Sequence, residues 1–163
     1  MPEAFRHIAW HKEHEPVGGT PNVAEAVAAR LGGVAGIGLE VHSDADLAGA
    51  VAGGFRVKSI DALRDGGVTE AEVGSLIIKP RTLSHRRANG GRLTIDESDR
   101  AARVARGLVL AEGAFGSRDK AHRWLHRNSA ALGDRKPMDL IRTDAGARVV
   151  ENLLARIAWG VAA

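Results

Sequence analysis

Histidines at helical spacing are the residues of this chain that come nearest to a metal site. His122 and His126 are four residues apart, which puts both imidazoles on one face of a helix. Zinc sites with this spacing also carry a glutamate between the histidines and a third ligand, and neither is evident here. A similar spacing recurs near the N-terminus at His7, His11 and His14. We interpret both groups as solvated histidines and predict no metal site.

The other reactive groups do not form a catalytic pattern. Gly32–Gly38 is rich in glycine but matches neither the dinucleotide nor the phosphate-loop motif, so we interpret it as a hinge. No Gly-x-Ser-x-Gly elbow is present. The acids Asp96, Glu97 and Asp99 suit the first turn of a helix, where they favour its dipole. Because cysteine is absent, thiolate chemistry and disulfides are excluded. We predict no catalytic residue and no cofactor.

The remaining candidate site is a segment with a high density of positive charge. Residues 79–92 hold five cations and no carboxylate, and two capping boxes flank them, Thr69–Glu72 and Thr94–Glu97. Pro80 suits a first helical turn and Asn89–Gly90 a C-cap. The pattern predicts a short helix, a tight turn and a cationic helix, which is how a helix-turn-helix presents its second helix to the DNA major groove.

On the helix that begins at Pro80, Leu83 is the residue we expect to point inward. Arg81 and His85 then point away from the core, Thr82, Ser84 and Arg86 lie at the sides, and the other cations are placed for phosphates. If about five phosphates are neutralised, the logarithm of the binding constant should fall with log salt at a slope of about −4 to −5. The alternative is a solvated cationic face. The predicted DNA-binding residues are Lys79, Arg81, Thr82, Ser84, His85, Arg86, Arg87 and Arg92.

Composition fits a helical protein that is not embedded in a membrane. Hydrophobic residues make up 44% of the 163 residues but aromatic residues only 4%, so the core must consist mainly of Ala, Val, Leu and Ile. The formal charge of +3 is modest, so its placement matters more than its size. No signal-peptide core and no run of about 18 apolar residues is present. We expect a cytoplasmic location.

Periodicity and capping signals predict an all-α chain. We expect helices from Asn22 to the Gly32–Gly33 pair, from Ser43 to Gly53, from Lys58 to Asp65, from Ile95 to Glu112 (ended by Gly113 and Gly116) and from Thr143 onward. Residues 36–41 alternate and suggest a short extended segment, and Trp124 and Leu125 suggest core positions. We predict a disordered tail over 1–21, a helix-turn-helix domain over 22–92 and a second helical domain over 93–163.

From Lys79 onward the chain resembles the Xre/MbcA/ParS antitoxins. The resemblance covers about half of the chain and includes many positions in the same order. Residues 36–92 are similar to the Cro/Xre-like DNA-binding part of that family. The matching residues are Pro80–Leu83, Arg86–Arg87, Leu93–Thr94, Glu97–Arg100, Phe115–Gly116, Lys120–Ala121, Trp124–Leu125, Leu132–Gly133, Pro137–Ile141, Thr143, Gly146, Val150–Leu154, Ile157 and Gly160.

The resemblance implies an antitoxin of a type II toxin-antitoxin pair. Its C-terminal domain would bind a RES-domain toxin, an enzyme that consumes NAD, and block the toxin's active site. Its helix-turn-helix would bind the promoter of its own operon. The resemblance also implies a homodimer within a larger toxin complex, with catalysis left to the toxin.

The last helix offers candidates for contact with such a toxin. Val150, Leu153, Leu154, Ile157 and Val161 form the core stripe, and a different stripe carries an Arg and a Trp, a composition typical of interface hot spots. Its alternative is a second core contact. The small residues at the end of the sequence are narrow enough to enter a cleft. The predicted toxin-binding residues are Arg148, Asn152, Trp159, Gly160, Val161, Ala162 and Ala163.

Three functional hypotheses follow, in descending order. The first is a repressor-antitoxin, the second is a stand-alone helix-turn-helix regulator whose C-terminal domain only dimerises, and the third is a small metal- or nucleotide-dependent enzyme. A neighbouring gene for a RES-domain toxin would separate the first from the second, and metal analysis and activity assays would test the third.

Overall fold

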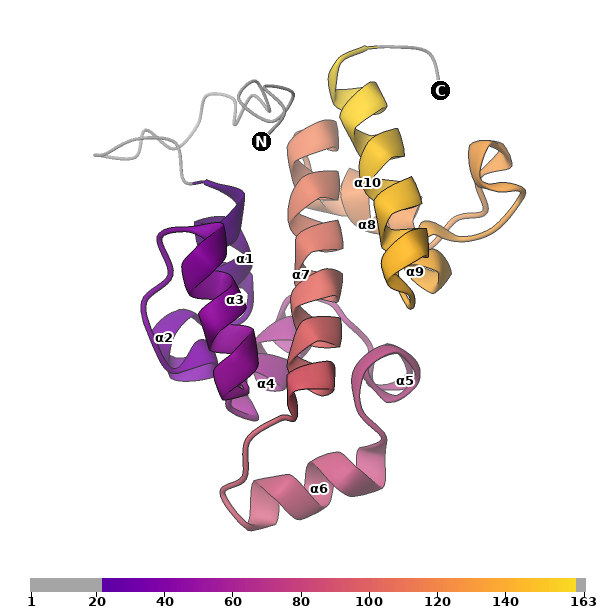
Figure 1. Cartoon of the computed structure of the whole chain (residues 1–163). Coiled ribbons are helices and arrows are strands. Elements are labelled where there is room, and N and C mark those ends of the chain that lie inside the picture. Colours follow the sequence, from indigo (N-terminus) through magenta and orange to yellow (C-terminus); the bar gives the residue numbers. More distant parts are fainter. Residues whose placement is uncertain (1–21, 161–163) are drawn as a thin grey trace. The chain divides into compact units, whose positions relative to one another are not determined.

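A computed structural model describes residues 22–160 of the chain (Figure 1). Helices dominate this part, which contains two isolated β-bridges but no strand. It divides into two compact units, residues 22–106 and residues 107–160, and the division falls within one long helix. The predicted all-α fold class is confirmed. The tail predicted over 1–21 lies outside the described residues.

The first unit begins with two short helices around the glycine-rich segment. Helix α1 (Val23–Arg30) starts at a capping box between Asn22 and Glu25, as the sequence predicts. Helix α2 (Gly33–Ile37) follows at once, so the prediction of an extended segment over 36–41 is wrong at its start. The reason is tertiary: a Cβ at Gly36 would overlap the carbonyl oxygen of Leu31 and approach the Cα of Ser59. The glycines here allow close packing of α2 rather than an extended strand.

Helices α3 (Asp44–Gly53) and α4 (Lys58–Asp65) have the bounds that the sequence predicts. Ser43 caps α3 through its side chain. On α4, Ile60 and Leu63 are fully buried, and α4 packs against α2. Helix α4 also supplies Asp61, which pairs with Arg87 further along the chain.

A tight helical pair follows α4. Thr69 and Glu72 form the predicted capping box at α5 (Glu70–Glu72), which continues into the π-helical turn η2 (Val73–Ile77). Val73, Leu76 and Ile77 are buried, as predicted. Helix α6 (Pro80–Ala88) comes next and starts with its proline in the first turn. The pair predicted as a helix-turn-helix is therefore α5–η2 followed by α6 (Figure 1).

The long helix α7 (Ile95–Phe115) opens at the third capping box, in which the N–H of Thr94 donates to Glu97 and the N–H of Glu97 donates to Thr94. The sequence predicts that Gly113 and Gly116 end it; the second is confirmed and the first is wrong. The helix continues to Phe115, whose ring lies 5.5 Å from that of Trp124. This contact outweighs the weak helix propensity of one interior glycine, and the helix ends at Gly116, whose φ of 60° is left-handed.

The second unit contains the short elements that follow α7. These are α8 (Arg118–Leu125), the 3₁₀ turn η3 (Ala130–Leu132), α9 (Pro137–Leu140) and α10 (Asp144–Ala158). Leu125 is fully buried as predicted, whereas Trp124 is only partly buried. Helix α10 packs on α9 and buries Val150, Leu153 and Leu154, three members of the predicted core stripe.

The division between the two units lies further along the chain than the domain boundary that we predict after Arg92. The first turn of α7 is tied to the earlier residues, because Ser98 is fully buried and its hydroxyl accepts the N–H of Phe55. The N–H of Leu93 also donates to the Phe55 carbonyl. The division comes between Arg106 and Gly107. None of the helices over residues 22–160 has the length and apolar character that crossing a bilayer demands.

Candidate functional site

The outward face of α6 presents polar and cationic side chains from the predicted DNA-binding set. Leu83 is buried, as predicted, and fixes which face of α6 is inward. Arg81 and His85 are exposed on the other side. Within residues 22–160, Arg81 and Lys79 make no side-chain hydrogen bond or ion pair. Their charges are therefore available to a polyanion.

The turn between η2 and α6 contains no glycine, and its backbone does not require one. The π-helical turn closes with a bond from the N–H of Ile78 to the carbonyl of Val73, after which Ile78 and Lys79 are both extended. Neither residue has a positive φ, so ordinary side chains fit without strain. Pro80 reinforces this geometry because it disfavours helical dihedrals at Lys79. The sequence thus sets the break between the two helices without a glycine.

The remaining predicted DNA-binding side chains differ in what they contact. Ser84 is exposed and Thr82 is partly buried. Arg87 pairs with Asp61 of α4, and Arg92 donates to the carbonyl of Gly54 at 2.7 Å. Arg86 pairs with Glu97. Three of the five predicted cations therefore already have partners within the first unit, which the sequence pattern does not reveal.

The second candidate surface is the outward face of α10. At about 100° per residue, most exposed residues of this helix and its C-cap fall on an arc of about 100°, and the exposed Asp144 and Ala158 lie beyond one edge of it. The predicted residues Arg148, Asn152 and Trp159 all lie on it. Sequence reasoning missed Val149, although the same periodicity places it there beside the buried Val150. The exposed face consists of Ala145, Arg148, Val149, Asn152, Arg156 and Trp159.

Two large apolar side chains make this face unusual. Val149 and Trp159 are each 49% exposed, and they are the only large hydrophobic residues exposed within 107–160. Trp159 is the C-cap of α10 and Gly160 follows with a left-handed φ of 66°. The last three predicted toxin-binding residues, Val161, Ala162 and Ala163, lie outside the described residues. An apolar face flanked by arginines has the composition of a protein-binding surface.

The two histidines at the end of α8 contact each other. His122 and His126 stack with ring centroids 4.1 Å apart, and Nδ1 of His126 lies 2.7 Å from the carbonyl oxygen of His122. Over residues 22–160 no group of three or more potential metal ligands comes together. His7, His11 and His14 lie outside this range.

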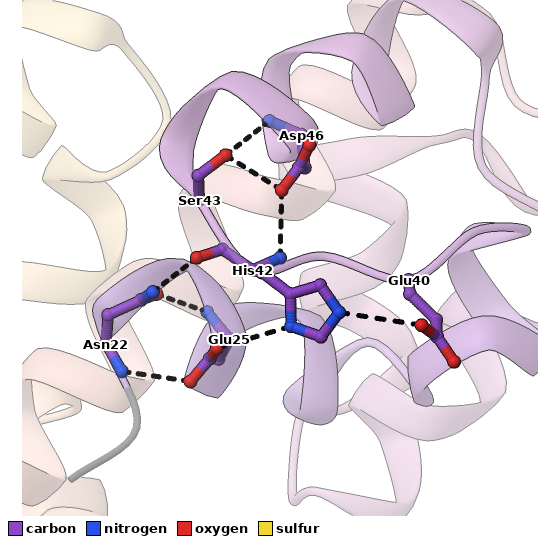
Figure 2. A network of polar contacts seen from close by, with 6 residues as sticks. All are labelled: Asn22, Glu25, Glu40, His42, Ser43 and Asp46. Atoms are coloured by element: carbon purple, nitrogen blue, oxygen red, sulfur yellow. Dashed lines mark hydrogen bonds and ion pairs between the residues drawn. The ribbon is translucent and has the colours of Figure 1, made fainter. Parts of the chain in front are cut away.

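A further polar network joins the start of α1 to the start of α3 (Figure 2). Asn22 donates to the carbonyl of His42 at 2.6 Å, and the His42 ring lies 3.4 Å from Glu25 and 3.5 Å from Glu40. Hydrogen bonds to Glu40 and then Glu25 raise the pKa of His42. The Ser43 hydroxyl and then the His42 N–H lower the pKa of Asp46. Because the histidine is exposed and Asn22, Glu25, Ser43 and Asp46 all belong to helix caps, we interpret this network as structural.

Comparison with known proteins matches both units to domain families. Residues 46–106 match the antitoxin Xre-like helix-turn-helix domain. Residues 110–160 match the antitoxin Xre/MbcA/ParS C-terminal toxin-binding domain. The first match contains α6 and the second contains α10, so each candidate surface lies in a domain of the corresponding kind.

Three similar proteins have names that agree with these matches. The chain is similar to an antitoxin Xre of Pseudomonas putida, with 35% identity over 121 residues that span 74% of this chain and 76% of that protein. An antitoxin Xre of Yersinia enterocolitica is 34% identical over 128 residues, 77% of this chain and 86% of that protein. A third, from Photorhabdus laumondii, is 39% identical over 85 residues, 52% of this chain and 57% of that protein.

Proposed function

Since this chain belongs to the Xre/MbcA/ParS antitoxin family, we propose that it neutralises a RES-domain toxin and represses its own operon. The observation that carries the proposal is the tandem match of a helix-turn-helix domain and a toxin-binding domain in one chain. The toxin would be the enzyme that consumes NAD, and this chain would act by binding in the cytoplasm.

For promoter binding, α6 is the recognition helix. Arg81 and His85 would face base edges, with Thr82 and Ser84 beside them, and Lys79 would contact a phosphate at the start of the helix. A homodimer would present two such helices to half-sites one helical turn apart. With Lys79 as the phosphate-contacting cation of the set and Arg81 at base edges, we now expect a salt slope of about −1 per bound chain rather than −4 to −5.

For toxin binding, the outward face of α10 is the contact surface. Val149 and Trp159 supply apolar area that is exposed in the free chain. Arg148 and Asn152 supply polar contacts around it. Residues 160–163 follow directly and would reach the mouth of the toxin's active site, so that substrate could not enter.

Co-expression with the neighbouring gene product tests this function. The full chain should co-purify with the toxin and restore growth, and a chain lacking residues 159–163 should lose rescue while it still binds promoter DNA. The double variant Arg81→Ala/His85→Ala should show the opposite pattern, with weakened promoter binding and full rescue.

Two outcomes would contradict the proposal. A truncated chain that still neutralises the toxin would overturn the assigned contact at the C-terminal residues. A chain that binds its promoter but neither binds nor neutralises any neighbouring product would favour the stand-alone regulator with a dimerising C-terminal domain.

A further inference from the structure

Arg86 belongs to the recognition helix by position but to the start of α7 by its contacts. Its guanidinium lies 3.1 Å and 3.2 Å from the two carboxylate oxygens of Glu97 and also donates to the carbonyl of Arg92. The side chains of Arg86 and Glu97 are only 22% and 13% exposed. This is a bidentate pair, the strongest and most directional form of arginine–carboxylate contact.

Both acceptors of Arg86 are themselves held in place. The Glu97 carboxylate also accepts the Thr94 N–H at 2.8 Å, as part of the capping box of α7. Arg92 is held in turn, because its guanidinium donates to the Gly54 carbonyl and its backbone bridges to Arg56. Arg86 therefore joins α6 to a framework that is fixed independently of α6.

A phosphate contact by Arg86 would break this arrangement. Glu97 would be left as a mostly buried carboxylate without its cation, which is unfavourable. Lys79 and Arg81 carry no such penalty, because their side chains have no partner within residues 22–160. The cations of α6 thus fall into two classes that the sequence does not distinguish.

We propose that Arg86 and Glu97 form a positioning pair that sets the orientation of α6 against DNA, and that Arg86 makes no phosphate contact of its own. The proposal rests on the promoter binding by α6 proposed above. Arg87 and Asp61 make the equivalent connection from α6 to α4. With Leu83 in the core, these links fix the helix at its C-terminal half and leave its N-terminal half facing outward.

The two roles predict opposite effects of neutralising Glu97. If Arg86 bound a phosphate, Glu97→Gln would release the arginine and remove a negative charge near DNA, so binding would tighten. If the pair positions the helix, Glu97→Gln should weaken binding about tenfold. Glutamine still serves a capping box, so the start of α7 is preserved.

The experiment is an anisotropy titration of the full chain with a labelled duplex from the region upstream of its gene, repeated over a range of KCl concentrations. Arg86→Gln and Glu97→Gln should each weaken binding about tenfold with an unchanged salt slope. The matched variant Lys79→Ala, which removes the phosphate-contacting cation, should reduce the slope by about 0.9 per bound chain. Arg86→Lys should restore little, because one ammonium cannot bridge both carboxylate oxygens and the Arg92 carbonyl.

Circular dichroism melts confirm that each variant is folded at the assay temperature, and Arg86→Lys supplies the mildest change if Arg86→Gln is unfolded. Provided that the wild-type chain binds, any one of three results would overturn the positioning role while promoter binding stands. These are a lower salt slope for Arg86→Gln, tighter binding by Glu97→Gln, or binding by Arg86→Lys that equals that of the wild type. A wild-type chain that shows no salt-dependent binding would overturn the proposed promoter binding and the positioning role with it.

Discussion

Replacing Trp159 with alanine is the most informative single test of the toxin-binding face. The Trp159 side chain is 49% exposed. A tryptophan presents up to about 250 Å², so about 120 Å² of mainly apolar surface is open to a partner. At about 25 cal/mol per Å², complete burial of that area contributes about 3 kcal/mol to binding, and the alanine Cβ retains a small part of it. Trp159→Ala should therefore weaken toxin binding by about 2–3 kcal/mol, about 30- to 150-fold in Kd.

The assay is calorimetric titration of the purified chain with a catalytically inactive form of the neighbouring toxin. Trp159→Phe should retain most of the affinity because it keeps an aromatic ring. The matched control is Ile95→Ala, which removes a side chain that is 57% exposed in the helix-turn-helix unit and should leave Kd unchanged. Thermal melts of each variant separate a binding effect from a loss of folding.

A clear result would refute the reasoning. If Trp159→Ala changes Kd less than about threefold while the variant remains folded, the tryptophan does not become buried in the complex and the face is wrongly assigned. If Ile95→Ala is equally harmful, exposed apolar area alone does not identify the toxin-binding surface.

Two further predictions concern the first unit. Gly36→Ala should destabilise the fold by about 3 kcal/mol or more, because the new Cβ would overlap the Leu31 carbonyl oxygen. Gly49→Ala on α3, where a Cβ would meet nothing within 4 Å, should stabilise the fold slightly. Chemical denaturation measures the free energy of unfolding of both variants, and equal effects would contradict the close approach of Gly36 to Leu31. Because Glu40 and Glu25 raise the pKa of His42 in the folded state, protonation of His42 should stabilise the fold below the ordinary histidine pKa. This stabilisation should be lost as the pH rises through the raised pKa. The difference in Tm between about pH 6 and pH 8 should therefore shrink in His42→Gln, and an unchanged difference would exclude the effect.

Much of the local structure was predictable because its signals act over a few residues. Asn22, Ser43 and Thr69 each cap a helix three residues from the backbone N–H that they accept. The start of α6 also follows from a local signal, the proline in its first turn. Where prediction failed, at α2 and at Gly113, distant residues decided the outcome.

The candidate sites show the same division. Periodicity identified the outward residues of α6 and part of the α10 face. Periodicity also places Val149 on this face, but it could not show that Val149 is exposed there, because exposure depends on what α9 and the rest of the unit cover.

The sequence by itself determined an all-helical chain with a cationic helix after a capped helical turn, since caps, prolines and periodicity act locally. Only the tertiary structure decided which cations remain available to a partner. The side-chain acceptor of Arg86, Glu97, lies 11 positions away, and the acceptors of Arg87 and Arg92 lie 26 and 38 positions away. The sequence gives the charge of a side chain, but the tertiary structure decides its partner, because burial and packing bring together groups that no local pattern connects.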